Sequence, residues 1–91
     1  MLRESGVKRR SGPVAVTAVV ADGFAEPRVA YAIQRSVGSA VRRNRVRRRL
    51  RAIAASCELA PGAYLISAAP AATELSYDEL AAHVRAALSA R

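Results

Sequence analysis

Eight arginines and no acidic residue lie between Arg35 and Arg51, which makes this segment the strongest chemical signal in the chain. Seven of the eight fall within VRRNRVRRRLR at positions 41–51. A guanidinium group is a planar fork of N–H donors that matches phosphate oxygens in pairs. The rest of the chain carries seven basic and seven acidic residues, so the whole net charge of +8 resides in this segment. Charge of one sign concentrated in this way is typical of a protein that binds a polyanion.

On a helix with about 100° per residue, positions 39–57 separate into an apolar stripe and two basic strips. The stripe has the spacing of a helix face that packs on a core, and it comprises Val46, Leu50, Ile53, Ala54 and Cys57. The first basic strip lies on one flank of the stripe and comprises Arg43, Asn44, Arg47, Arg48 and Arg51. The second basic strip lies on the other flank and comprises Arg42, Arg45 and Arg49. We predict that both strips, together with Arg35, bind the polyanion.

Phosphate groups would relieve a repulsion that is built into this helix. Two arginines one turn apart destabilise a helix by about 0.2–0.5 kcal/mol, and several such pairs occur here. Asn44 adds a neutral donor and acceptor that suits a sugar hydroxyl or a base edge. A merely solvated face usually mixes both signs of charge. A helix that lies on a lipid surface needs apolar residues opposite its charges, and here the core needs that face. The pattern therefore favours a nucleic acid.

The residues that could act as an independent catalyst are few, and each has a structural explanation. His83 is the single histidine and is predicted as a surface or boundary residue of the last helix. Cys57 is predicted as a small buried side chain. Asp78 and Glu79 are explained by helix capping and the helix dipole. Neither a metal-ligand spacing nor a phosphate-binding glycine loop is apparent, so we predict no catalytic and no metal-binding residue in this chain.

The remaining bulk properties indicate a small cytoplasmic protein. Ninety-one residues suit a single domain, and we treat residues 1–91 as one RNA-binding domain. One cysteine cannot form an intrachain disulfide, which fits a reducing compartment. No apolar run has the length of a membrane span, and MLRESGVKRRSGP lacks the apolar core of a secretory signal.

Periodicity and breakers predict an α+β fold with a small antiparallel or mixed sheet and helices packed on it. Strands are predicted at 13–21, 28–34 and 63–69, and the first two are expected to form a hairpin through a turn at 22–27. Residues 1–12 are predicted to be irregular or a frayed helix end, in which Lys8, Arg9 and Arg10 either contact phosphates or form a solvated tail. The last helix begins at Ser76, which forms a capping box with Glu79, and runs to about residue 90. The predicted order is β-β-α-β-α.

The segment VGSAVRRNRVRRRLRAI at 37–53 resembles the signature of the bacterial ribonuclease P protein family. That signature is a Gly-x-Ala-Val-x-Arg-Asn run followed by basic residues at fixed helical steps. The matching positions are Gly38, Ala40, Val41, Arg43, Asn44, Arg47, Arg48 and Arg51. The flanking segments RVAYAIQRSVG and GAYLISAAPAATELSYDEL also look like the family's strands and last helix. The resemblance covers roughly residues 13–90.

The resemblance implies a protein subunit of the ribonucleoprotein that removes the 5′ leader from precursor tRNA. The implied partners are a catalytic RNA subunit and precursor tRNA, with no membrane and no small-molecule substrate. The catalytic groups and Mg²⁺ are expected on the RNA, and the location is the bacterial cytoplasm. The implied fold is that of ribosomal protein S5 domain 2, with a left-handed β-α-β crossover around the basic helix. General connection rules would predict a right-handed one.

The chain also departs from the family pattern. Family members usually begin with a helix whose aromatic residues line a cleft for the leader, and this chain begins where that helix would be ending. We therefore expect that helix to be missing or truncated. Thr17 stands where the first strand often has an aromatic residue, and Gln34-Arg35-Ser36 stands where lysines are usual. Tyr31 is the candidate for stacking on a leader base, although packing is an alternative role for it.

Three other functions are compatible with the same charge pattern. The first alternative is a different RNA-binding protein, such as a ribosomal or assembly module. The second is a DNA-binding protein whose arginine-rich helix enters a major groove, although no helix-turn-helix pairing or zipper is apparent. The third is a protein that lies on an anionic membrane surface.

Overall fold

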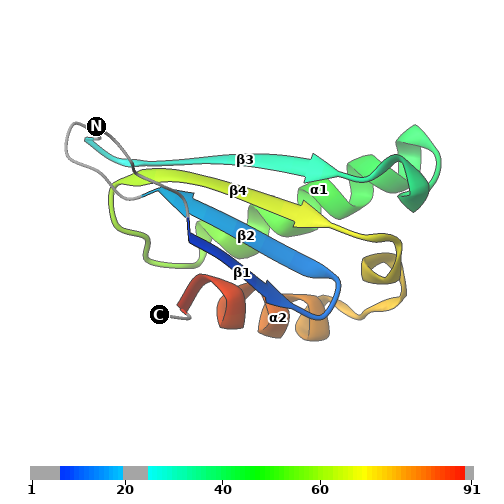
Figure 1. Ribbon diagram of the computed structural model, residues 1–91. Coiled ribbons are helices and arrows are strands. Elements are labelled where there is room, and N and C mark those ends of the chain that lie inside the picture. The colour runs from blue at the N-terminus through cyan, green and yellow to red at the C-terminus, as the bar shows by residue number, and fades with distance from the viewer. Residues whose placement is uncertain (1–6, 20–24, 90–91) are drawn as a thin grey trace.

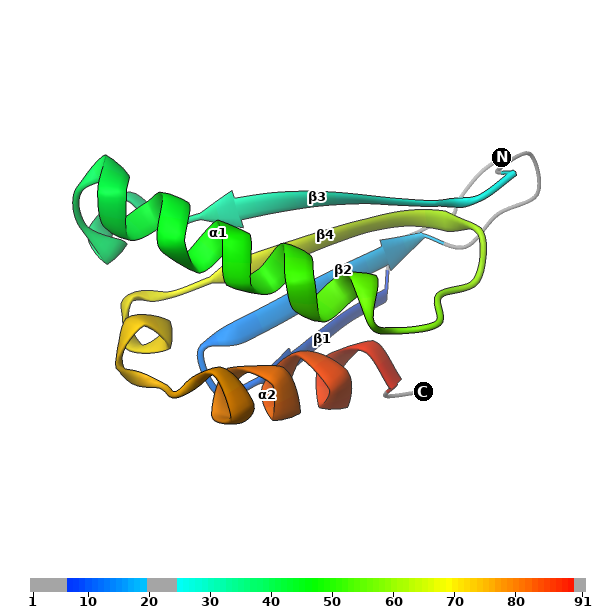
Figure 2. The same cartoon turned by 180° about the vertical axis from the view of Figure 1, so that it is seen from behind.

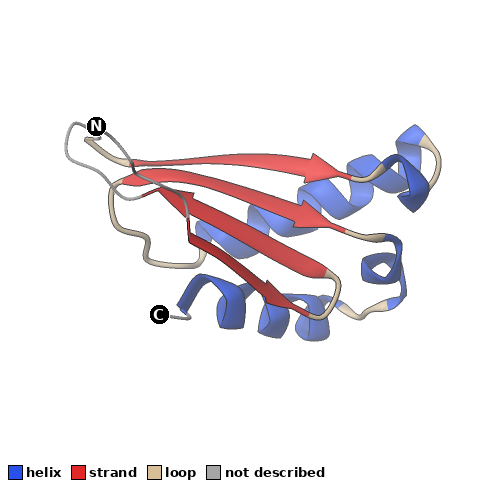
Figure 3. Cartoon of the chain, viewed as in Figure 1, coloured by secondary structure: helices blue, strands red, loops and turns tan. Residues whose placement is uncertain are grey.

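A four-stranded sheet with two helices on one face makes up the described part of the computed structural model, residues 7–19 and 25–89 (Figure 1). The strands are β1 (Val7–Ser11), β2 (Val14–Val19), β3 (Pro27–Ile33) and β4 (Gly62–Ala68). The helices are α1 (Ala40–Ala55) and α2 (Tyr77–Ser89), with two short 3₁₀ helices, η1 (Arg35–Val37) and η2 (Pro70–Glu74). Figures 2 and 3 show α1 and α2 side by side on the same face of the sheet, in front of it in Figure 2 and behind it in Figure 3. The predicted α+β class is confirmed.

The strand order β1-β2-β4-β3 places β4 between the two strands that were predicted to pair as a hairpin. Val16 of β2 lies opposite Ile66 in an antiparallel pair, and Tyr31 of β3 lies opposite the same Ile66 in a parallel pair. The hairpin prediction is therefore wrong. A nearly all-apolar strand is most stable in a central position with a neighbour at each edge, and β4 takes that position. Residues 20–21 of the predicted strand and 22–24 of the predicted turn lie outside the described residues, and Pro27 belongs to β3.

The connection from β3 through α1 to β4 is left-handed. In Figure 2, α1 lies in front of the sheet, the β3 arrow points left, and β4 runs parallel to β3 and lies below it. With the strands turned to point upward, the chain therefore crosses from right to left over the near face. The handedness expected from the family resemblance is confirmed, against the general preference for right-handed crossovers.

Residues 7–11 form an edge strand where the sequence predicted irregular structure. β1 pairs antiparallel with β2, with Ser11 opposite Val14, so Gly12 and Pro13 form a two-residue loop. Gly12 has φ +57°, and a proline ring holds φ negative. These are the signs of a type II′ hairpin turn. VKRRS lacks the apolar alternation that marks a strand, but charged residues are common on edge strands. The element order is thus β-β-β-α-β-α.

The core lies between the sheet and the two helices. Its largest fully buried side chains come from β2, β4, α1 and α2, and they are Val14, Val16, Leu50, Ile53, Ile66, Leu80 and Val84. Four members of the apolar stripe predicted for α1 are buried, namely Val46, Leu50, Ile53 and Ala54. The fifth, Cys57, follows the end of the helix and is half-buried, with Sγ donating to the Ile53 carbonyl at 3.3 Å.

Both helices begin at the residues that their sequences indicate. The Arg42 N–H donates to Ser39 Oγ at 3.3 Å and caps α1. At α2, the Ser76 N–H donates to Glu79 Oε1 at 2.9 Å and the Glu79 N–H donates to Ser76 Oγ at 3.1 Å. The capping box is confirmed, and it satisfies two N–H groups that have no partner inside the helix.

The β1–β2 loop predicts that Gly12→Ala destabilises the protein by about 1–3 kcal/mol. An added Cβ would lie 2.7 Å from the His83 ring, at a φ that alanine rarely adopts. Denaturant unfolding measures the loss. The same substitution made in a His83→Ala background should be less harmful, because the ring contact is gone. Equal stability of Gly12→Ala and the parent protein would contradict the loop geometry.

Candidate nucleic-acid interface

The two basic strips of α1 face different parts of the molecule because the buried apolar stripe, here also called the seam, lies between them. The first strip borders β3, where the charge of Arg51 acts on Tyr31. The second strip faces η2 and the segment after it, where Arg49 Nη1 donates to the Leu75 carbonyl at 3.4 Å. The predicted division of the arginines into two flanks therefore corresponds to two distinct surroundings in the fold.

The first strip forms an open hollow of about 430 Å³, lined by Val41, Asn44, Arg47, Arg48 and Arg51. Arg47 Nη1 donates to Asn44 Oδ1 at 2.6 Å, which fixes the two side chains relative to each other. This bond occupies the side-chain carbonyl oxygen of Asn44. The amide N–H groups of this exposed side chain are therefore the donors that Asn44 can offer to a ligand. The hollow can therefore offer several guanidinium forks and one neutral amide to a phosphate-sugar backbone.

The structure brings together four of the five residues predicted for this strip. Arg43 lies on the same flank but is half-buried and does not line the hollow. Sequence reasoning missed Val41, which is 70% exposed at the rim of the hollow. A single exposed valine produces no periodic pattern, so only its place in the family signature could have indicated it. Arg35 lies on η1, exposed, and lines neither strip's hollow.

The second strip forms a narrower cavity of about 260 Å³, in which Arg42, Arg45 and Arg49 meet Val46 and Thr73. Thr73 belongs to η2, which follows α1 and β4 in the sequence. Sequence reasoning grouped the three arginines correctly by helical spacing. It did not indicate that Thr73, from another element, would form one wall of the cavity.

Tyr31, the candidate for base stacking, lies on the helix-covered face of β3. It is half-buried and packs against the core. Burial raises the pKa of the Tyr31 hydroxyl above its ordinary value of 10.0, and the nearby Arg51 guanidinium opposes part of that rise. The position places Tyr31 beside the first strip rather than on the opposite face of the sheet. Its stacking role stays a prediction.

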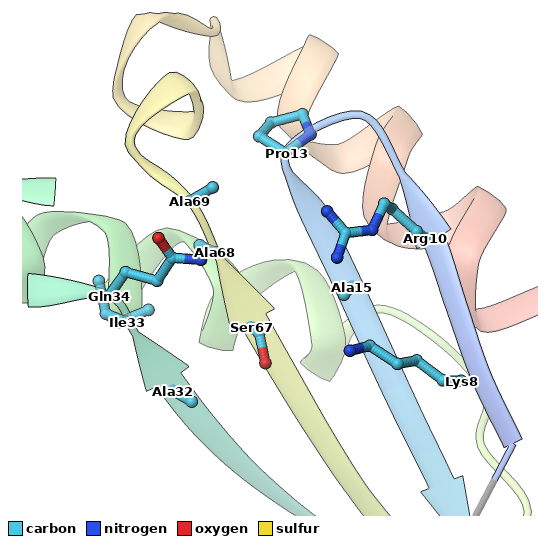
Figure 4. Close-up of a pocket in the computed structure, with 10 residues that line it drawn as sticks. All are labelled: Lys8, Arg10, Pro13, Ala15, Ala32, Ile33, Gln34, Ser67, Ala68 and Ala69. Carbon is cyan, nitrogen blue, oxygen red and sulfur yellow. The ribbon is translucent and has the colours of Figure 1, made fainter. Parts of the chain in front are cut away.

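The opposite face of the sheet carries a cavity of about 290 Å³ near the β1–β2 loop (Figure 4). Lys8 and Arg10 extend from β1 over β2, as Figure 4 shows. The strand register aligns Arg10 with Ala15, Ser67 and Ala32 in one row across the sheet. The small side chains of that row make a low floor beside two cations. Gln34 and Ala69 complete one side of the cavity.

The described side chains that could carry acid–base chemistry or bind a metal do not gather into a site. His83 Nδ1 lies 2.8 Å from Ser11 Oγ, and this contact joins α2 to β1. No three His, Cys, Asp or Glu side chains gather into a metal-binding group among the described residues. Mg²⁺ prefers carboxylate and other oxygen ligands, and these residues do not fit a site for it.

None of the described helices combines the length and apolar character needed to span a bilayer.

Comparison of the sequence with known proteins finds two matches. A family model described as Ribonuclease P matches residues 2–90. The curated ribonuclease P protein component of Thermobifida fusca is 44% identical over 71 residues, which is 75% of this chain and 48% of that protein. The chain therefore spans about half the length of that curated relative.

Solved structures share the fold at low sequence identity. The RNase P protein of Staphylococcus aureus matches with a TM-score of 0.81 at 15% identity, over 91% of this chain and 78% of that one. The RNase P protein of Thermotoga maritima matches with a TM-score of 0.80 at 17% identity, over 91% of this chain and 81% of that one.

The raised pKa of Tyr31 predicts a loss of stability at alkaline pH. Its neutral form is favoured in the folded state, so its contribution is fully present below pH 10 and is lost as pH rises through the folded-state pKa. Between pH 8 and pH 11 we expect the parent protein to lose more thermal stability than Tyr31→Phe. Tyr77 is 43% exposed, and Tyr77→Phe is the control for the loss of a tyrosine hydroxyl. Identical pH profiles for Tyr31→Phe and the parent would contradict the prediction.

Proposed function

This chain belongs to the ribonuclease P family, and we propose that it is the protein subunit of the ribonucleoprotein that removes the 5′ leader from precursor tRNA in the bacterial cytoplasm. The observation that carries the proposal is the first basic strip. There Asn44, Arg47, Arg48 and Arg51 line an open hollow on one flank of α1, with Asn44 bonded to Arg47. The hydrogen bonds found for Arg47 and Arg49 go to neutral oxygens, so these side chains keep their full charge for phosphates.

The first role that we propose for the chain is to bind the catalytic RNA through α1. Each guanidinium that meets a phosphate releases condensed counterions, which makes the binding favourable and strongly dependent on salt. Phosphates placed between the arginines also replace their mutual repulsion by attraction. α1 should therefore be more stable in the complex than in the free protein.

The second role is to hold the single-stranded leader on the open face of the sheet. The support for this role is the row of small side chains beside Lys8 and Arg10 (Figure 4). Proteins that bind single strands usually combine a basic groove with aromatic stacking platforms. The described residues that line this cavity include no aromatic residue. We therefore propose a leader contact that acts mainly on phosphates and tolerates different base sequences.

The catalytic groups and Mg²⁺ are proposed to belong to the RNA component. Hydrolysis of a phosphodiester by metal ions needs ligands that position both the attacking and the leaving oxygen. The described residues of this chain do not supply such a set. What the chain supplies is positive charge at fixed positions, which lowers the repulsion between two RNA molecules that must meet.

Arg47→Ala/Arg51→Ala tests the RNA-binding role. Loss of two phosphate contacts should reduce the slope of log K against log salt by about 2. Stimulation of precursor cleavage by the cognate catalytic RNA at near-physiological Mg²⁺ should fall with it. Arg28→Ala/Arg85→Ala carries the same charge loss outside α1 and should leave both readouts close to the parent values. Intact RNA binding without any stimulation by the parent chain would instead indicate a different RNA-binding protein.

Lys8→Ala/Arg10→Ala tests the leader contact in the assembled ribonucleoprotein. We expect the affinity for precursor tRNA to fall roughly tenfold, equivalent to about 1.4 kcal/mol, while the affinity for mature tRNA is unchanged. Binding of the catalytic RNA should also be unchanged, because neither residue lies on α1. Equal losses for precursor and mature tRNA would contradict a leader contact.

A further inference from the structure

The cavity beside the second basic strip has the character of a built site rather than of an open charged surface. Its walls come from two elements, with three guanidinium-bearing residues from α1 and Thr73 from η2. Val46, which is 3% exposed, closes its base. The cavity of about 260 Å³ is large enough for a tetrahedral oxyanion and several waters. No acidic residue lines it.

Arg49 is held by a hydrogen bond before any ligand binds, and Arg42 packs over Gly38. Arg49 is half-buried, and its Nη1 donates to the Leu75 carbonyl just after η2. The Arg42 side chain passes over Gly38, where an added Cβ would lie 3.0 Å from Arg42 Cδ. The glycine of the signature, at φ +134°, therefore leaves room for Arg42. Fixed guanidinium groups lose less side-chain entropy when they bind an anion than free ones do.

The opposite wall is fixed as well. Thr73 Oγ1 donates its hydrogen to the Pro70 carbonyl at 2.8 Å, which closes η2 on itself. The donors that face the cavity are therefore guanidinium N–H groups, without competition from a carboxylate. Guanidinium forks in this arrangement match the oxygens of a phosphate group.

The cavity is separated from the first strip by the body of α1. Arg47 and Arg49 lie about 160° apart around the helix axis, and a helix with its side chains is about 10–12 Å wide. A single extended RNA strand that follows the first strip runs along the β3 side, whereas the cavity lies between α1 and η2. Phosphates bound at the two places therefore belong to different stretches of backbone.

We propose that the Arg42–Arg45–Arg49 cavity is a separate phosphate-binding pocket, and that it holds a phosphate from an RNA segment other than the one on the first strip. The ligand chemistry is a phosphate group, which either an RNA backbone or a free phosphate species supplies. The RNA part of this inference rests on the proposed function, whereas the pocket itself does not. α1 then lies between two RNA segments and sets their spacing.

The pocket is tested on the RNA-free protein with pyrophosphate as the probe. We expect saturable changes in the amide NMR signals of Thr73 and Leu75. Arg45→Gln should weaken that binding at least fivefold, and Arg48→Gln, which removes the same charge from the neighbouring hollow, should leave it unchanged. Equal weakening in the two variants, or no change at Thr73 and Leu75, would overturn the pocket. Arg42→Gln serves as a second variant if Arg45→Gln fails to fold.

The RNA source is tested by hydroxyl-radical footprinting of the cognate catalytic RNA with the same variants. We expect Arg45→Gln and Arg48→Gln to lose protection at different, non-overlapping backbone positions. Loss at the same positions would overturn the two-segment arrangement. A pyrophosphate response with no RNA position sensitive to Arg45→Gln would assign the pocket to free phosphate and overturn its RNA role. Absence of any footprint with the parent protein would instead refute the proposed function, and the pyrophosphate titration would still decide the pocket.

Discussion

Burial of the apolar seam of α1 is the interaction on which the rest of the structure depends. Val46, Leu50 and Ile53 are between 0% and 3% exposed, and full burial of each such side chain contributes about 1.5–3 kcal/mol. Each arginine pair one turn apart opposes the helix by only about 0.2–0.5 kcal/mol. The seam therefore outweighs the repulsion and holds the helix in the fold. Because the seam occupies one side of the helix, the arginines are confined to its two flanks.

The left-handed crossover decides what each flank meets. α1 enters from the edge strand β3 and returns the chain to β4 in the middle of the sheet (Figure 2). One flank thus borders β3 and Tyr31, and the other faces η2 and Leu75. The same arrangement keeps both helices on one face of the sheet (Figure 3) and leaves the row of small side chains on the other face uncovered by α1 and α2. Three basic surfaces with different shapes result from one small fold.

Side chains that could take part in proton transfer serve structural roles here. His83 contacts Ser11 and lies against Gly12, which joins the β1–β2 loop to α2. Glu79 caps the same helix, and Cys57 donates to the end of α1. These contacts hold the β1–β2 loop against α2 and stabilise the start of α2 and the end of α1.

The sequence determined the features that local spacing controls, and pairing between distant segments determined the rest. The seam, the two strips and the capping box at Ser76 follow from residues three or four apart, so they could be predicted. β1 could not, because VKRRS has no strand pattern and is stable only through its pairing with β2. The hairpin was predicted wrongly because nothing local shows that β4 enters between β2 and β3. The site divides in the same way. The arginines could be grouped from the sequence, but Arg49 meets the Leu75 carbonyl 26 residues away, and only the tertiary fold closes that cavity.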